Sequence, residues 1–146
     1  MVSQFKGNFA FLSNFQHLSF PIIDGNIGYY SVEHYYVAMK TLDEETRLKV
    51  STHPFEGLKA FGRTIELRPD WEDIKLDVME WGLRQKFKNN YMLRRKLIKT
   101  GDEYLQEGNF WKDKYWGVCL RTGNGKNHLG KLLMKIRGEL IAGGKL

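Results

Sequence analysis

Features that mark several common classes of protein are scarce in this chain of 146 residues. Cys119 is the only cysteine, which excludes an intramolecular disulfide and a cysteine-rich zinc site. The four histidines are dispersed, and no spacing among them matches a zinc site. There is no Gly-x-Ser-x-Gly segment, so we expect no serine nucleophile of that kind. With only 3 prolines and no repeat or low-complexity tract, the sequence predicts one folded domain over residues 1–146 and no bound metal.

Long apolar runs are also missing. No stretch approaches the roughly 20 apolar residues that a membrane-spanning helix needs. Residues 1–10 lack the basic and then apolar pattern of a secretory signal. The single cysteine fits a reducing compartment. We therefore expect a cytoplasmic protein without a membrane partner.

Positive charge is what the sequence has in excess. The net charge is +6 and the isoelectric point about 9.4, which favours phosphates, nucleotides or nucleic acid as partners. The excess is moderate and does not choose between a nucleotide and a polymer. Residues 84–99 form a basic run that includes Phe87 and Tyr91. This run either follows a nucleic-acid backbone or is a solvated helix face.

Helical periodicity dominates the apolar pattern, with a few short β-rich runs between. We expect strands over residues 5–12, 19–23, 104–107 and 115–120, and helices over residues 31–40, 43–50, 56–62, 70–87, 91–99 and 127–141. Asp24-Gly25-Asn26 predicts the turn of a β-hairpin. The pattern indicates a mostly helical α+β fold.

Helix ends are marked by residues with known capping preferences. Ser31, Asp70 and Asn127 are each expected to cap a helix N-terminus, and Asp73 stands where a capping box has its acid. Gly101 is expected to end a helix in the left-handed conformation. Two apolar stripes are expected to be buried: Trp71, Ile74, Val78 and Trp81 on one helix, and Leu129, Leu132, Leu133, Ile136 and Leu140 on the last.

The segment from Ser31 to Lys40 is the most informative for chemistry. On a helix, Glu33, either Tyr36 or Val37, and Lys40 share one face, and Glu33 and Lys40 lie about 10 Å apart along the axis. Helical side chains lean towards the N-terminus, so Lys40 can reach back over Tyr36. A carboxylate, a phenol and an amine then converge. The alternative is that Glu33 only complements the helix dipole and Lys40 is solvated.

Other candidates for substrate binding are weaker taken singly. Ser13 and Asn14 stand among aromatic residues, where Asn14 can bond to a base edge or simply lie in a turn. Arg63 and Arg68 carry the planar fork that suits phosphate. Trp71 either stacks on a base or packs in the core.

A glycine-rich loop, Gly123-Asn124-Gly125-Lys126-Asn127, follows Trp116-Gly117 and precedes the last helix. Loop amides and a helix N-terminus together can hold a phosphate. The segment is not a Walker A loop, because Leu120 replaces its first glycine and Asn127 its serine or threonine. An ordinary connection with Asn127 as the cap is the alternative.

Taken in order, these segments resemble the NADAR family, also called YbiA-like or riboflavin-intermediate N-glycosidases. The resemblance covers nearly the whole chain. It is carried by Phe11-Leu12-Ser13-Asn14-Phe15, Ser31-x-Glu33-His34-Tyr35 with Lys40, Gly62-Arg63, Arg68-x-Asp70-Trp71-Glu72, Met79-x-x-Gly82-Leu83-x-x-Lys86-Phe87, Thr100-Gly101, Trp116-Gly117 and Gly125-x-Asn127-x-Leu129-Gly130-x-Leu132-Leu133-Met134.

The resemblance implies hydrolysis of a ribosyl N-glycosidic bond without a redox cofactor. Its implied substrates are early phosphorylated riboflavin-pathway intermediates or ADP-ribose on guanine in nucleic acid, so nucleic acid is a second expected contact. We expect Glu33, Lys40 and Asp70 to be catalytic. The expected substrate-binding residues are Ser13, Asn14, Tyr36, Arg63, Trp71, Trp116, Gly117, Lys126 and Asn127.

One position departs from the family pattern. An acid often follows the Trp-Gly pair, and here Val118 stands there. Either that acid is dispensable, or Asp113 substitutes for it, or substrate choice differs. A non-catalytic module that binds ADP-ribose or nucleic acid is the alternative function, and it has no need of Glu33 or Lys40.

Overall fold

The computed structural model describes residues 1–146 and is mostly helical with a few short strands, an α+β fold as the sequence predicts. Contacts divide the chain into two compact units. One unit is residues 17–90, and the other joins residues 1–16 to residues 91–146. The one-domain organisation stays a prediction.

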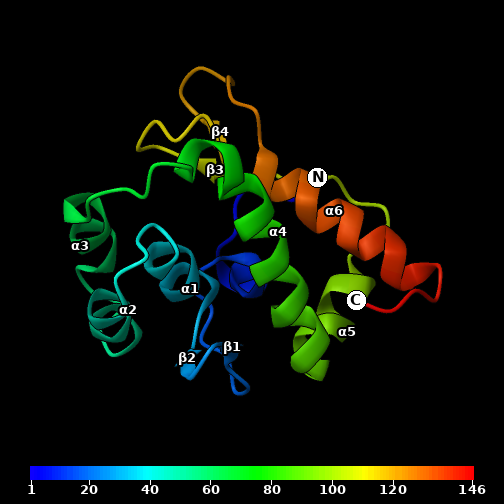
Figure 1. The fold of residues 1–146 in the computed structure, drawn as a ribbon. Coiled ribbons are helices and arrows are strands. Elements are labelled where there is room, and N and C mark those ends of the chain that lie inside the picture. Colours follow the sequence, from blue (N-terminus) through cyan, green and yellow to red (C-terminus); the bar gives the residue numbers. More distant parts are fainter. The chain divides into compact units, whose positions relative to one another are not determined.

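The unit of residues 17–90 is built around helix α1 (Val32–Ala38), every residue of which is buried. Helices α2 (Glu44–Ser51), α3 (Leu58–Thr64) and α4 (Trp71–Asn89) pack against α1. Strands β1 (Ile22–Asp24) and β2 (Ile27–Tyr29) form the predicted antiparallel hairpin, seen in blue in Figure 1. Gly25 at its turn has φ +60°, the left-handed conformation that glycine adopts readily.

The other unit brings both ends of the chain together. Helix α5 (Tyr91–Lys99) packs against the 3₁₀ helix η1 (Gly7–Leu12) and against α6 (His128–Ile141). Strands β3 (Gly108–Asn109) and β4 (Val118–Cys119) form a short parallel pair, and Val2 bridges to Leu105. In Figure 1 this unit comprises the dark blue start of the chain and the segment from α5 to the red C-terminus.

The strand predicted over residues 5–12 is wrong. Residues 7–12 form η1, with the amides of Phe9 and Ser13 bonded three residues back to Lys6 and Ala10. Phe11 and Leu12 are the buried residues of η1.

The other predicted strands are shorter or displaced. Strand β1 begins at Ile22, because the backbone of Phe20 bonds to the Asn90 side chain through both its amide and its carbonyl, each at 3.1 Å. Strand β3 lies after the predicted range 104–107, and β4 keeps only the residues of the range 115–120 that face β3. The ends of these strands depend on residues far along the chain with which their backbones bond.

The buried face of α4 differs from the predicted stripe. Trp71 is buried, but Trp81 is 39% exposed, and Ile74 and Val78 are half-buried. The buried residues towards its C-terminal end are Met79, Gly82, Leu83, Lys86 and Phe87. A Cβ on Gly82 would lie 2.8 Å from the Tyr35 ring, so the glycine marks where α4 approaches α1.

Helix α6 matches its prediction in length and face, with Leu129, Leu132, Leu133 and Ile136 buried and Leu140 half-buried. The predicted end of α5 is also confirmed, since Gly101 has φ +63°. None of the helices combines the length and apolar character needed to cross a bilayer.

Candidate functional site

The start of α1 is held by the side chains of Ser31 and His34. The Ser31 Oγ accepts the amide proton of His34 at 3.0 Å, which confirms the predicted cap. The His34 ring reaches the same Oγ through Nδ1 at 2.6 Å and the His53 carbonyl through Nε2 at 2.8 Å. A carbonyl only accepts, so Nε2 carries the proton, and burial lowers the pKa of the ring. His34 is therefore a neutral, structural residue.

Glu33, Tyr36 and Lys40 come together as predicted. Glu33 and Tyr36 are 7% and 8% exposed, and the Lys40 Nζ lies 5.9 Å from the centroid of the Tyr36 ring. The helix ends at Ala38, two residues earlier than expected, so Lys40 reaches back from the following turn. Burial lowers the pKa of Lys40, while the Glu33 carboxylate acts to raise it.

Helix α3 forms the next wall of this cluster through Gly62 and Arg63. The Gly62 carbonyl accepts from the Lys40 Nζ at 3.4 Å. A Cβ on Gly62 would lie 3.2 Å from Val37 and 3.5 Å from that Nζ, so glycine permits the approach. The exposed guanidinium of Arg63 lowers the pKa of Lys40 further, as does Lys59.

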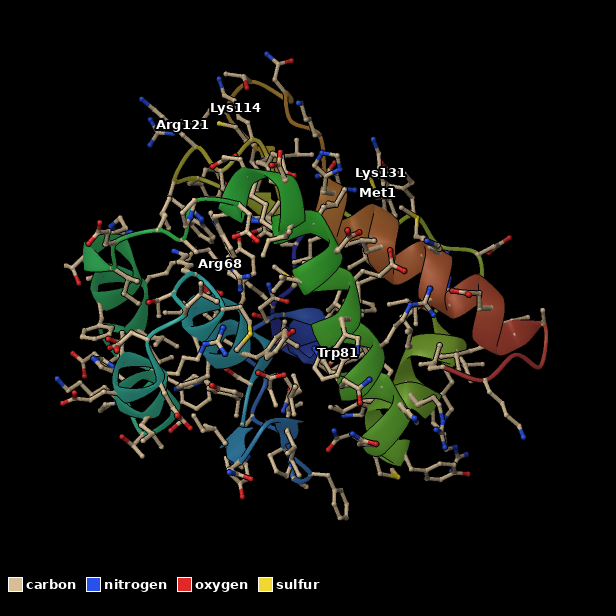
Figure 2. All side chains as sticks on the ribbon, in the orientation of Figure 1. Met1, Arg68, Trp81, Lys114, Arg121 and Lys131 are labelled. Atoms are coloured by element: carbon tan, nitrogen blue, oxygen red, sulfur yellow. The ribbon has the colours of Figure 1, made fainter.

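The segment before α4 completes the cluster. It differs from two predictions, the Asp70 helix cap and the free Arg68 fork for phosphate. Asp70 stands at the N-cap position but makes no cap bond through its side chain. Its carboxylate instead accepts two bonds from the Arg68 guanidinium, at 2.7 and 3.2 Å. That pairing holds the pKa of Asp70 below its usual range. Arg68, labelled in Figure 2, is thus occupied by Asp70, and its amide bonds to the Lys40 carbonyl at 2.7 Å.

Trp71 is only 4% exposed, and its ring lies 5.0 Å from that of Tyr36. This burial favours core packing, the alternative to base stacking, and makes Trp71 a support for the Tyr36 ring.

The glycine-rich loop of the other unit does not present the amides expected to hold a phosphate. The amides of residues 126–129 donate in turn to the carbonyls of Lys114, Gly117, Tyr115 and Trp116, at 2.8 to 3.2 Å. These four consecutive amides at the entry to α6 are therefore already bonded within the protein. The side chain of Lys126 is exposed, with its Nζ 5.9 Å from the Tyr115 ring.

Asn127 is not a side-chain cap. Its backbone is left-handed, with φ 53°, and its side chain turns away from α6. The Asn127 Oδ1 accepts from the Glu107 amide at 3.0 Å, and its Nδ2 donates to the Leu105 carbonyl at 2.9 Å. Asn127 is only 2% exposed, and its side chain joins the start of α6 to Leu105 and Glu107.

Trp116 and Gly117 are held by two carboxylates. Asp113 accepts from the amides of Tyr115 and Trp116 at 3.1 and 2.9 Å, so its carboxylate shapes the loop. Gly117 has no room for a side chain, because a Cβ would meet the Glu107 backbone and carboxylate. Val118 is a buried strand residue. Glu107 is thus the acid beside Gly117, and nothing in its spacing marked it in the sequence.

Ser13 and Asn14 lie in a turn after η1. A turn was the alternative to the prediction that Asn14 bonds to a base edge. The Ser13 Oγ accepts from the amide of Phe15 at 3.1 Å. No group of three or more histidine, cysteine or acidic side chains is arranged to hold a metal ion. The expected residues therefore lie in two sets: Glu33, Tyr36, Lys40, Arg63, Asp70 and Trp71 in one unit, and Ser13, Asn14, Trp116, Gly117, Lys126 and Asn127 in the other.

Known proteins resemble this chain in sequence. A riboflavin biosynthesis protein of Vibrio vulnificus is 37% identical over 137 residues, covering 91% of this chain and 36% of that protein. N-glycosidase YbiA of Escherichia coli is 40% identical over 111 residues, covering 74% of this chain and 68% of that protein. The chain thus spans little more than a third of the Vibrio relative.

The fold and the family model agree with these relatives. The NMR structure of the E. coli protein YbiA matches with a TM-score of 0.80 and 33% identity, over 98% of this chain and 88% of that chain. The model of the NADAR domain matches residues 3–141. The chain therefore belongs to the NADAR family.

Proposed function

We propose that the protein is an N-glycosidase that hydrolyses a ribosyl N-glycosidic bond in a phosphorylated, nucleotide-like substrate. The observation that carries this proposal is the buried cluster of Glu33, Tyr36 and Lys40, in which burial lowers the pKa of the amine beside a carboxylate. The names of relatives, N-glycosidase and riboflavin biosynthesis protein, support the same reaction class.

The chemistry requires a negative group near the sugar and a proton for the leaving nitrogen. As the bond between C1′ and nitrogen breaks, its electron pair goes to nitrogen and positive charge develops on the sugar. The Glu33 carboxylate stabilises that charge and takes a proton from the attacking water. The Lys40 ammonium, 3.4 Å from the Gly62 carbonyl, donates a proton to the departing nitrogen.

Lys40 has a second available role. An amine with a lowered pKa is neutral more often, so it can attack the aldehyde of the opened ribose and form a Schiff base with loss of water. Asp70 does not suit proton donation, because its pairing with Arg68 keeps it ionised. We assign it instead the positioning of the segment whose Arg68 amide binds the Lys40 carbonyl.

Two substrate types fit the proposal. The name of the Vibrio relative, a riboflavin biosynthesis protein, supports a riboflavin-pathway intermediate. The net charge of +6 supports ADP-ribose on guanine in nucleic acid. The alternative function, a non-catalytic binding module, requires the glycine-rich loop to hold a phosphate through its amides. The amides of residues 126–129 are bonded within the protein, so the loop does not support the module.

The test is turnover of both substrate types by the wild type and by Glu33→Gln. Release of ribose 5-phosphate from the riboflavin intermediates and of ADP-ribose from modified DNA are measured side by side. We expect Glu33→Gln to lower kcat by about 10²- to 10⁴-fold on the substrate that the wild type cleaves.

Glu45→Gln is the matched control, because Glu45 lies on α2 with its side chain 81% exposed. It should leave turnover unchanged. Full activity of a folded Glu33→Gln variant, checked by circular dichroism, would remove the carboxylate role.

A further inference from the structure

Two neighbouring loops of the unit formed by residues 1–16 and 91–146 carry exposed aromatic rings and cations without a role in the proposed reaction. Phe110 and Trp111 are 53% and 54% exposed. We call these two loops the stacking loops. They are defined by the exposed residues Phe110, Trp111, Lys112, Lys114, Arg121 and Lys126. Large exposed rings on a soluble protein commonly mark a contact surface.

The fold holds the first of these loops on a rigid base. Asn109 is fully buried, its Oδ1 accepts from the Asp113 amide at 3.0 Å, and its Nδ2 donates to the Asp113 carbonyl at 2.9 Å. These reciprocal bonds close residues 110–112 into a projecting tip. Lys112 in that tip has φ 65°, a left-handed conformation that is uncommon for lysine.

The same pairing brings the second loop beside the first. Asn109 faces Cys119 in the parallel pair of β3 and β4, and its carbonyl accepts the Leu120 amide at 2.8 Å. The Lys126 amide bonds to the Lys114 carbonyl at 2.8 Å. Figure 2 shows the side chains of Lys114 and Arg121 projecting from these loops. The loop that carries the two rings therefore lies beside the loop that carries Arg121 and Lys126.

The charge of this surface has one sign. Four cations, Lys112, Lys114, Arg121 and Lys126, stand against one carboxylate in residues 110–126. That carboxylate, Asp113, is engaged by two backbone amides. A groove or surface of cations with aromatic rings is the arrangement that holds single-stranded nucleic acid, because bases stack on the rings and phosphates meet the cations.

Helix α5 is the competing basic surface and is less suited to stacking. Its exposed ring, Tyr91, already has the guanidinium groups of Arg94 and Arg95 at 5.3 and 5.8 Å from its centroid. The stacking loops instead have two adjacent rings, each more than half exposed.

We propose that the stacking loops bind a single strand of nucleic acid, with bases on Phe110 and Trp111 and phosphates on the four cations. The inference rests on the proposed function for the reaction. It adds to that function a polymeric ligand, single-stranded nucleic acid. Binding itself is measured without turnover, so the two proposals fail separately.

The experiment measures the anisotropy of a fluorescent 20-nucleotide oligo(dT) as protein is added at several salt concentrations. Phe110→Ala/Trp111→Ala should weaken binding at least ~10-fold, because each stacked base contributes strongly. Lys114→Ala/Arg121→Ala should reduce the slope of log affinity against log salt by about 1.4, the value for two lost phosphate contacts on a single strand. Arg94→Ala/Arg95→Ala on α5 is the matched control and should bind as the wild type does.

Absence of oligonucleotide binding by the wild type would overturn the inference. So would unchanged binding by a folded Phe110→Ala/Trp111→Ala variant, or loss of binding only in the α5 variant. Turnover of a riboflavin-pathway intermediate by the ring variant at the wild-type rate, with oligonucleotide binding lost, supports the inference and shows an intact enzyme. If the oligonucleotide binds through the loops but no substrate is hydrolysed, the proposed function fails and the nucleic-acid surface stands.

Discussion

The N-terminal ends of helices α1 and α6 began from similar sequence signals and reached opposite structures. Ser31 has an extended backbone, and its hydroxyl accepts the amide proton of His34. Asn127 has a left-handed backbone, and its amide group bonds to Leu105 and Glu107 instead of to α6. A capping residue follows its local preference only where no distant backbone group competes for its side chain.

This difference also separates the two candidate sites. At α1, one side chain and a few neighbours complete the helix start, and Glu33, Tyr36 and Lys40 are placed together on the same segment. At α6, carbonyls of residues 114–117 accept from the amides of residues 126–129. A helix N-terminus binds an anion only when its amides are free to donate, which is why we propose the reaction at α1.

Replacing Lys40 is the strongest test of that contrast. Lys40→Met should lower kcat by about 10²- to 10⁴-fold, because the cluster loses its proton donor or amine. Lys49→Met, whose side chain on α2 is 67% exposed, should not change kcat. Equal activity of the two variants would mean that the amine near Tyr36 has no part in the reaction.

The same lysine allows its two roles to be separated. If Lys40 forms a Schiff base, sodium borohydride added during turnover should link substrate to protein, and mass spectrometry should place the adduct on Lys40. If Lys40 is only a proton donor, no adduct forms although the wild type is active.

The next largest effect concerns stability at α6. Asn127→Ala should reduce the free energy of unfolding by about 3 kcal/mol, because two buried backbone groups lose their partner and alanine is strained at φ 53°. Asn127→Gly removes the same bonds without the strain, so it should be about 1 kcal/mol more stable than the alanine variant. Urea unfolding followed by tryptophan fluorescence measures both, and equal losses would show that the backbone is not strained.

A smaller loss is expected at α1. Ser31→Ala should cost about 2 kcal/mol, since it removes one helix cap and the partner of the His34 ring. If Ser31→Ala proves more damaging than Asn127→Ala under the same conditions, the local cap matters more than the distant bridge, and the comparison is reversed.

The smallest effect is a pH dependence from His34. Its pKa lies below the ordinary 6.5 in the folded protein, so the unfolded chain binds the proton first as the pH falls. Its contribution to stability is complete above pH 6.5 and decreases as the pH falls from 6.5 through the folded pKa. Melting temperatures measured over this range should show a decline in the wild type that is reduced in His34→Gln. Identical pH profiles would assign the decline to other groups.

Short-range signals in the sequence predicted their structures well. The Asp24-Gly25-Asn26 turn, the Ser31 cap and the Gly101 helix end depend on atoms a few residues apart, and all three are confirmed. Glu33, Tyr36 and Lys40 lie close together as helical spacing predicted, although Lys40 belongs to the turn after α1. The roles of these residues in catalysis stay predictions.

Long-range partners account for the errors. Nothing near residues 5–12 shows that they form a 3₁₀ helix, and nothing near Asn127 reveals Leu105 as its partner. The buried face of α4 includes Gly82 and Lys86, because Tyr35 packs closely against Gly82. The spacing of the apolar residues did not predict this contact.

By itself, the sequence determined the helices, the hairpin, the positive charge, the family resemblance and the order of a carboxylate, a phenol and an amine along one segment. Only the tertiary structure decided that Gly62 accepts from Lys40, that Asp70 belongs to Arg68, that Glu107 lies beside Gly117, and that the loop amides before α6 are occupied. The physical reason is that a buried polar group must find a partner. Which partner it finds depends on segments that folding brings close, which spacing along the chain does not record.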